Sequence, residues 1–439
     1  MIARLTTALA AAILLPLPAV AEVEIQEITT PGGITAWLVE EHSIPFTSIE
    51  VQFEGGANEE PLEARGATYL MMGLLEEGAG DMDARAFSER REALAARTDF
   101  DANNDSVTIG LSFLTENREE SVDLMRAALV DPSFDPEAVE RVREQVLAGL
   151  AADARDPQEI AGETFAALSF PEHPYGSRIE GTPETVAALN IDDLRTAHTR
   201  ALTRDRARVG VTGDITAEEL APLLDRLLGD LPESDPVDIP EVETALDGGI
   251  TVVDFPSPQS VVLFGHSGIA FDDPDYFAAF ILNHIIGGRG FDSRLMTEVR
   301  EKRGLTYGIG TFLSPRDKSE EMLGQFSSSN DKAAEAIEIV RAEWAHIAEE
   351  GVTPEELDAA KTYLTGAYPL RFDGNSRIAG ILTGMQSLDL PIDYIPNRND
   401  RIEAVTLDDV KRVAAELLRP EDLHFVVVGQ PDGLRSGSF

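Results

Sequence analysis

The hydrophobic positions of this chain follow two different periods along its length. Short runs rich in β-branched and apolar residues predict strands, for example over residues 34–39 and 107–111. Apolar residues three or four positions apart predict helices over residues 121–129 and 333–347. Because helical stretches lie between strand candidates, the pattern predicts an α/β (α+β) fold with largely antiparallel sheet flanked by helices.

The pattern also repeats at a long period. Asp192 begins a helical stretch that leads to a strand ending at Gly213, and Asp408 begins one that leads to a strand ending at Gly429. The offsets are equal, because 408 − 192 and 429 − 213 both give 216. Equal offsets indicate an internal duplication.

A second pair of helix starts supports this duplication. A capping residue precedes proline at Asp135-Pro136 and again at Thr353-Pro354, with an offset of 353 − 135 = 218. We therefore predict two homologous halves, 22–230 and 250–432. Proline and acidic residues dominate the stretch that follows the first half, which predicts a linker over 231–249, and residues 433–439 form a tail.

The first 21 residues have the features of a secretory signal peptide. Arg4 precedes an apolar run over residues 8–15, and small residues end the segment at Ala21. Pro16 and Pro18 interrupt the apolar run too early for a membrane span. We expect cleavage after Ala21 and a periplasmic or secreted product without a membrane span.

The composition excludes several classes of site. The chain has no cysteine, which rules out disulfides, thiolate metal sites and a cysteine nucleophile. It has 36 basic and 79 acidic residues and a net charge of -43, so its surface repels nucleic acid phosphates. Two interpretations of this charge remain open: a solvated acidic surface, or an acidic chamber that attracts cationic peptides.

One stretch in the second half carries the most specific signal. Residues 293–308 contain Ser293-Arg294-Leu295 and Arg303-Gly304-Leu305, preceded by Asn283 and the glycine pair at 287–288. This stretch resembles the second-half signature of pitrilysin/insulinase-type metallopeptidases. The resemblance implies paired halves that form a clamshell around a chamber for an extended peptide.

The resemblance also implies an inverted zinc motif, His-x-x-Glu-His, on a helix of the first half. The matching stretch here is 66–78, in which Tyr69 and Gly73 replace the two histidines and Met72 replaces the general-base glutamate. Gly149 stands at the position of the third ligand. By this alignment these are degenerate zinc-motif positions, and we expect no metal and no cofactor in this chain.

In relatives, an arginine and a tyrosine seven residues later reach towards the substrate. Arg300 and Tyr307 have this spacing, since 307 − 300 = 7. An arginine and a phenol can donate hydrogen bonds to a peptide carbonyl or to an oxyanion. The alternative is structural, with Arg300 in a surface ion pair and Tyr307 partly buried in a strand.

Three functional hypotheses follow. The first is a non-catalytic, substrate-binding subunit of an exported zinc metallopeptidase, similar in role to the non-zinc subunit of mitochondrial processing peptidase, whose partner chain carries the zinc. The second is a stand-alone peptide-binding or structural scaffold protein with no peptidase role. The third is a hydrolase that uses Glu76 and Glu77, but adjacent helix residues point about 100° apart and make a poor acid/base pair.

Overall fold

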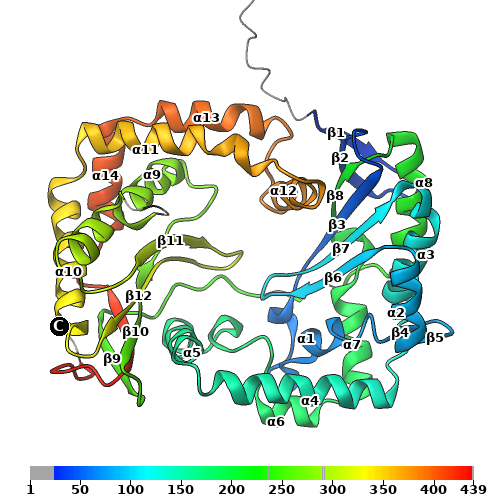
Figure 1. The fold of residues 1–439 in the computed structure, drawn as a ribbon, viewed down its shortest axis with the longest axis horizontal. Coiled ribbons are helices and arrows are strands. Elements are labelled where there is room, and N and C mark those ends of the chain that lie inside the picture. The colour runs from blue at the N-terminus through cyan, green and yellow to red at the C-terminus, as the bar shows by residue number, and fades with distance from the viewer. Residues whose placement is uncertain (1–23, 236, 289, 291, 438–439) are drawn as a thin grey trace, which may run out of the picture.

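A computed structural model describes residues 24–235, 237–288, 290 and 292–437. The predicted signal peptide, 1–21, lies outside the described residues. Figure 1 shows two halves, each built on a sheet with helices around it, that face each other across the molecule. None of the helices in the described ranges is long and apolar enough to cross a membrane.

The first half contains a six-stranded sheet in the order β1-β2-β8-β3-β7-β6. Every neighbouring pair is antiparallel except β2 and β8. The strands are β1 (Gln26–Thr29), β2 (Thr35–Glu40), β3 (Phe46–Glu54), β6 (Arg97–Ala102), β7 (Ser106–Leu114) and β8 (Ala207–Gly213), with a small ribbon of β4 (Gly78–Ala79) and β5 (Met82–Asp83). The helices are α1 (Ala67–Met72), α2 (Ala84–Ala93), α3 (Arg118–Val130), α4 (Pro136–Asp153), α5 (Pro157–Ser169), α6 (Pro183–Ala188), α7 (Ile191–Ala201) and α8 (Ala217–Leu228).

The second half contains a five-stranded sheet in the order β11-β12-β10-β13-β9, antiparallel except for β13 and β9. Its strands are β9 (Gly249–Asp254), β10 (Gln259–Ser267), β11 (Ile309–Pro315), β12 (Glu320–Ser329) and β13 (His424–Gly429). Its helices are α9 (Tyr276–Gly287), α10 (Ala333–Glu350), α11 (Pro354–Gly366), α12 (Asn375–Ser387), α13 (Tyr394–Ala404) and α14 (Leu407–Leu417), with a π-helical turn η6 (Met296–Glu301) and a 3-10 turn η7 (Tyr368–Arg371).

The two sheets have the same topology. The order β2-β8-β3-β7-β6 in the first half corresponds to β9-β13-β10-β12-β11 in the second, and the single parallel pair falls at the same place. The predicted caps are present as well, because Asp135 accepts a hydrogen bond from the backbone N–H of Glu137 and Thr353 forms a capping box with Glu356. The predicted fold of two homologous, largely antiparallel halves is confirmed.

The halves exchange equivalent helices. Helix α5 begins at Pro157 and α12 at Asn375, an offset of 375 − 157 = 218 that matches the duplication. Helix α12 packs on β8 and β3 of the first half, while α5 packs on β10 and β13 of the second. Each sheet is therefore covered on one face by a helix that belongs to the other half.

Close packing and polar contacts hold the exchanged helices. Gln386 of α12 donates to the carbonyl oxygen of Val209 at 2.9 Å, and Thr383 donates to Glu50 at 2.8 Å. On the other side, Phe165 of α5 is buried in an apolar cluster with Val426 and other residues of the second sheet. The two halves are therefore joined by packing contacts as well as by the irregular segment between α8 and β9.

Candidate functional site

Buried anchors hold the segment that contains Arg300 and Tyr307. Leu295 and Val299 are fully buried in the core of the second half. Arg294 pairs with Glu356 of α11 through two bonds, Nε to Oε1 at 2.6 Å and Nη2 to Oε2 at 2.7 Å. The Ser-Arg-Leu motif therefore fastens η6 to α11 through a bidentate ion pair.

Tyr307 follows η6 in a short loop whose neighbours are fixed. Leu305 is buried and its carbonyl oxygen accepts a bond from Ser328 at 2.6 Å, while Thr306 donates to the carbonyl oxygen of Ser327 at 2.7 Å. The side chain of Tyr307 is nevertheless 90% exposed. A loop with ordered contacts thus presents a phenol to solvent, and the structural alternative of a partly buried Tyr307 in a strand is wrong.

Arg300 lies on η6 and is half-buried. Its carbonyl oxygen accepts a bond from the N–H of Gly304 at 2.9 Å, which closes the turn before Tyr307. Its side chain does not line the cavity to which Tyr307 contributes. The predicted pair therefore shares one segment of chain, while Tyr307 alone of the two reaches this cavity wall.

That cavity, here called the basic cavity, has a volume of about 1380 Å³. It lies in the second half between α9, α11, β11 and the segment that contains Tyr307. Aromatic side chains form much of its wall, including Phe280 and Phe312, and Tyr363 stacks on His284 with ring centroids 4.9 Å apart. Burial lowers the pKa of His284, so its imidazole is neutral at pH 7.

The degenerate zinc-motif positions lie on and after α1, against α4. Met72 is 2% exposed and belongs to the core, whereas Tyr69 is 37% exposed. A Cβ on Gly73 would lie 3.3 Å from Val142 of α4. Gly149 is two helical turns beyond Val142, and a Cβ there would meet open space. Helices α1 and α4 thus meet near Gly73 and Val142, whereas Gly149 lies farther along α4 at an exposed position.

The surroundings of Tyr69 are acidic. Burial and the charges of Glu180, Asp101 and Asp153 raise the pKa of the Tyr69 phenol. Within the described residues there is no group of three or more His, Cys, Asp or Glu side chains that could hold a metal ion.

Glu76 and Glu77 point to different partners. Glu76 forms an ion pair with Arg91 of α2, and Glu77 forms one with Arg141 of α4. Each carboxylate therefore lies against a guanidinium on a different element, an arrangement that does not suit a joint acid/base role.

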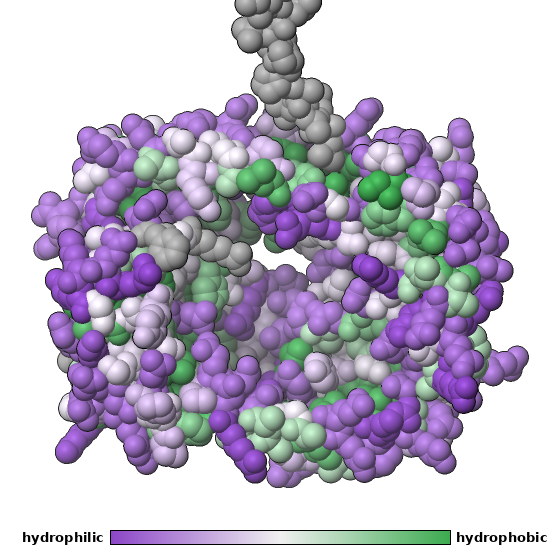
Figure 2. All heavy atoms as spheres, viewed as in Figure 1, coloured by the Kyte–Doolittle hydropathy of each residue, from purple (hydrophilic) through white to green (hydrophobic). Residues whose placement is uncertain are grey.

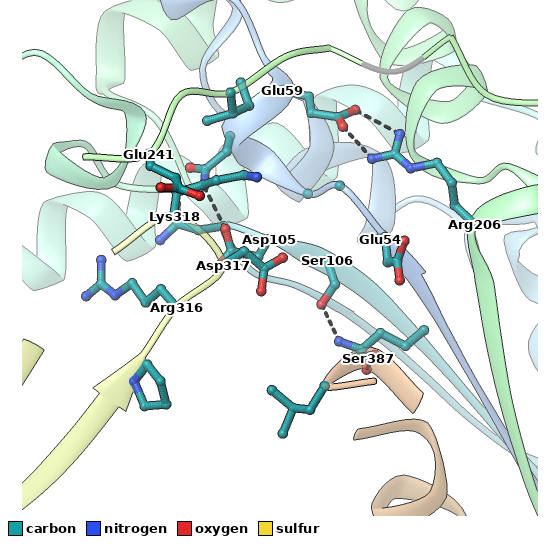
Figure 3. A pocket seen from close by; sticks show the side chains of 18 of the residues that line it. Glu54, Glu59, Asp105, Ser106, Arg206, Glu241, Arg316, Asp317, Lys318 and Ser387 are labelled. Carbon is teal, nitrogen blue, oxygen red and sulfur yellow. Dashed lines mark hydrogen bonds and ion pairs between the residues drawn. The ribbon is translucent and has the colours of Figure 1, made fainter. Parts of the chain in front are cut away.

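A second cavity, here called the junction cavity, lies where the two halves meet and has a volume of about 810 Å³. The turn between β6 and β7 contributes Asp105, the start of β7 contributes Ser106, and the turn between β11 and β12 contributes Arg316, Asp317 and Lys318 (Figure 3). Residues of the predicted linker, including Glu241, also line it. The face in Figure 2 is hollowed between the two halves and is rich in polar residues.

Acidic side chains dominate the junction cavity. The hydroxyl of Tyr175 donates to Asp105 at 2.7 Å and accepts a bond from the backbone N–H of Lys318 at 3.1 Å, so it bridges the two turns. Burial and the nearby charges of Asp105 and Glu54 raise the pKa of Asp317 to about 6. Burial and the charges of Glu241 and Asp272 also raise the pKa of Glu320, which lines the same cavity.

Sequence reasoning found the loop of Tyr307 but missed most of the residues that line both cavities. In particular, Arg371, Arg377 and Arg398 contribute to the basic cavity from η7, α12 and α13. These arginines lie in no motif. The one feature of the sequence that could have pointed to them is that arginines are uncommon relative to acidic residues in this chain.

Comparison with known proteins gives matches over most of the chain. A model for the insulinase family (peptidase family M16) matches residues 36–183, and a model for the peptidase M16 inactive domain matches residues 188–364. A non-peptidase homologue, YmxG, from Helicobacter pylori is 25% identical over 390 residues, covering 89% of this chain and 90% of that protein.

Two further matches extend this result. The beta subunit of the mitochondrial-processing peptidase from Blastocladiella emersonii is 22% identical, with 91% of this chain and 87% of that protein covered. A solved structure of a peptidase M16 inactive domain from Pseudomonas fluorescens has a TM-score of 0.87 and 26% identity, covering 95% of this chain and all of that one. The resemblance predicted from residues 293–308 is confirmed, and the chain belongs to the insulinase (M16) family, which includes non-peptidase homologues.

Proposed function

We propose that this chain is the non-catalytic, substrate-binding subunit of an exported zinc metallopeptidase. A partner chain of the same family carries the zinc site, and this chain supplies Arg300 and Tyr307 to the bound peptide. The proposal includes export through the signal peptide over residues 1–21, with the mature protein in the periplasm or secreted.

The observation that carries the proposal is the presentation of Tyr307. Its ring is 90% exposed, although the residues around it are anchored by buried contacts and backbone hydrogen bonds. Holding a tyrosine side chain in water gains no burial energy, so a binding role accounts for it better than packing does. Its phenol can donate a hydrogen bond to a peptide carbonyl or an oxyanion.

The side chains on α1 support a non-catalytic role. Tyr69, Met72 and Gly73 offer no imidazole and no carboxylate at the aligned motif positions. A zinc site of this family's type needs imidazoles to bind the metal and a carboxylate to activate the metal-bound water. A zinc-bearing partner would provide them.

Open sheet edges suit an extended peptide. Strand β6 is the edge of the first sheet and contacts α1, while β11 is the edge of the second sheet and begins two residues after Tyr307. A peptide can add to such an edge through backbone hydrogen bonds. Peptide binding therefore needs no further rearrangement of either sheet.

The test combines the purified chain with a zinc-bearing relative from the same organism. We expect the chain alone to contain no stoichiometric zinc and to cleave no peptide, and the mixture to cleave. Arg300→Ala or Tyr307→Phe should lower cleavage in the mixture by roughly 10²-fold, as expected for loss of a hydrogen-bond donor to the reacting carbonyl. Arg303→Ala is the matched control, because it removes an arginine from the same segment whose guanidinium is bonded to Glu298.

Three outcomes would contradict the proposal. Stoichiometric zinc with cleavage by the chain alone would make it an independent enzyme. Peptide binding without any cleavage in the mixture would favour the stand-alone binding protein. If cell fractionation finds the chain in the cytoplasm with its signal segment retained, the proposed export is wrong.

A further inference from the structure

The basic cavity differs in charge from the rest of the molecule. The chain has 79 acidic residues against 36 basic ones, yet no Asp or Glu is found among the described residues that line this cavity. The arginines of the described ranges that line it are Arg371, Arg377 and Arg398. The charge of this cavity is therefore opposite to that of the protein as a whole.

Arg398 forms part of the cavity wall and is 6% exposed. Its Nη1 donates to the carbonyl oxygen of Leu364 and to Oδ1 of Asn399, both at 3.1 Å. Its guanidinium also lies 4.2 Å from the ring centroid of Tyr368. These partners are all neutral, and no carboxylate in the described part of the chain forms an ion pair with Arg398.

Burial and the neighbouring charge of Arg371 lower the pKa of Arg398, although an arginine remains protonated at physiological pH. A buried charge without a counter-ion is costly, and a bound anion would relieve that cost. The cavity therefore contains a positive charge that no carboxylate of the described residues pairs with.

Arg371 and Arg377 lie at the exposed rim of the same cavity. Arg371 ends η7 and Arg377 is in the first turn of α12, with Gly374 at a φ of 92° between them. Both side chains are exposed, and neither has an ion-pair partner within the described ranges. Arginine forks bind carboxylates through paired hydrogen bonds, so two free guanidinium groups at the rim suit such a ligand.

We propose that the basic cavity binds a carboxylate group of an extended peptide. Arg371 and Arg377 receive the carboxylate at the rim, over the positive charge of Arg398. The aromatic wall of Phe280, Phe312 and Tyr363 packs against the adjacent apolar side chain, and the open edge of β11 offers backbone hydrogen bonds to the same peptide. This inference rests on the proposed function only in taking the ligand to be a peptide.

The junction cavity has the opposite charge, and this difference supports the choice of a carboxylate as the ligand of the basic cavity. Glu54, Asp105 and Asp317 line it, so a carboxylate-bearing segment is repelled there. A peptide that spans both cavities would place its acidic group in the basic cavity.

The test measures binding of fluorescent peptides to the purified chain by anisotropy. The probes are a peptide with a central Phe-Glu and a free C-terminus, the same peptide with Gln for Glu, and both peptides with an amidated C-terminus. We expect the doubly acidic peptide to bind at least about tenfold more tightly than the one with neither carboxylate. If affinity falls only when the C-terminus is amidated, the cavity binds the terminal carboxylate. If it falls only when Glu is replaced by Gln in the peptide, the cavity binds the glutamate side chain.

The variant R371Q/R377Q should weaken binding of the acidic peptide by about tenfold or more and leave the neutral peptide unchanged. Both side chains are exposed, so the variant is expected to fold, which circular dichroism checks. Arg401→Gln is the control, because Arg401 lies on α13 beside Arg398 but does not line the cavity.

Equal affinity for acidic and neutral peptides would overturn the proposal, as would acidic-peptide affinity that survives R371Q/R377Q. The measurement needs no zinc-bearing partner. A failure of the two-subunit function would therefore show in the cleavage assay and leave this binding result standing.

Discussion

The two halves of this protein share a topology but differ in what their equivalent regions present. In the second half, Arg294 and Leu295 anchor a segment that exposes Tyr307 beside a cavity. In the first half, the helix aligned with the family's zinc motif carries Tyr69 and Met72, and Met72 has become part of the core. The comparison teaches that corresponding regions of one topology can present an exposed side chain in one half and a core side chain in the other.

The largest expected effect concerns the helix exchange. Gly210 of β8 lies under α12, where an added Cβ would be 2.2 Å from the carbonyl oxygen of Ala379. On the second sheet, α5 packs on β10, where a Cβ on Gly265 would lie 2.6 Å from the carbonyl oxygen of Met322 and would also meet the side-chain ends of Leu323 and Phe165. We expect Gly210→Ala to lower the free energy of unfolding by about 3 kcal/mol and Gly265→Ala by about 1–2 kcal/mol, because the backbone contact at Gly265 is longer and its other two neighbours are side-chain ends that can shift.

Chemical denaturation of both variants measures this difference. Equal losses of stability, or a larger loss for Gly265→Ala, would mean that α12 packs less tightly on the first sheet than its backbone position indicates.

A smaller effect is expected from two ion pairs at corresponding places. Arg294 pairs with Glu356 of α11 in the second half, and Glu77 pairs with Arg141 of α4 in the first, so the charges are reversed. The Arg294 side chain is 16% exposed, whereas that of Arg141 is 47% exposed. We expect Arg294→Ala to cost about 2 kcal/mol of unfolding free energy and Glu77→Ala less than about 1 kcal/mol, because water screens the exposed pair.

The stabilisation by Arg294 should depend on pH. Burial would raise the pKa of Glu356, but hydrogen bonds from Arg294 and from the backbone of Thr353 outweigh burial and lower it. A carboxyl with a lowered folded-state pKa stabilises above its unfolded pKa and loses that stabilisation as pH falls through the folded value. The difference between thermal melts of wild type and Arg294→Ala should therefore shrink as pH falls below 4.5, the ordinary value of a glutamate, and a difference that does not change with pH would contradict the pairing.

The smallest effect compares the two turns that meet at the junction cavity. Asp105 accepts hydrogen bonds from Tyr175 and Asn58, whereas burial and the charges of Asp105 and Glu54 raise the pKa of Asp317 to about 6. A raised folded-state pKa gives stability that is fully present below the unfolded value, near 4, and is lost as pH rises through about 6. We expect Asp317→Asn to be more stable than wild type at pH 8 by about 1 kcal/mol, after allowing for solvent screening.

This advantage should disappear below about pH 4, where wild-type Asp317 is protonated in both states. Asp105→Ala is the control and should be destabilising at both pH values, because it leaves two hydrogen-bond donors without their acceptor. A variant Asp317→Asn that is less stable than wild type at pH 8 would show that the carboxylate is stabilising there.

The sequence by itself determined the elements, the duplication and the family. Strand β7 and helices α3 and α10 cover their predicted segments, β2 covers all of its segment except Ile34, and the caps at Asp135 and Thr353 are formed as expected. These features are local, since periodicity and capping depend on residues a few positions apart. The sequence alone also shows that Tyr69, Met72 and Gly73 stand at the aligned motif positions, because this depends only on residue type.

The tertiary structure alone decided what those elements pack against. Periodicity shows that α5 and α12 have a buried face, but not that each buries it on the sheet of the other half. It cannot show that Tyr307 reaches a cavity wall while Arg300 does not, or that Arg371 and Arg398, 27 positions apart (398 − 371), line the same cavity. Such contacts depend on the path of the whole chain, so the charge of each cavity appears only in the folded structure.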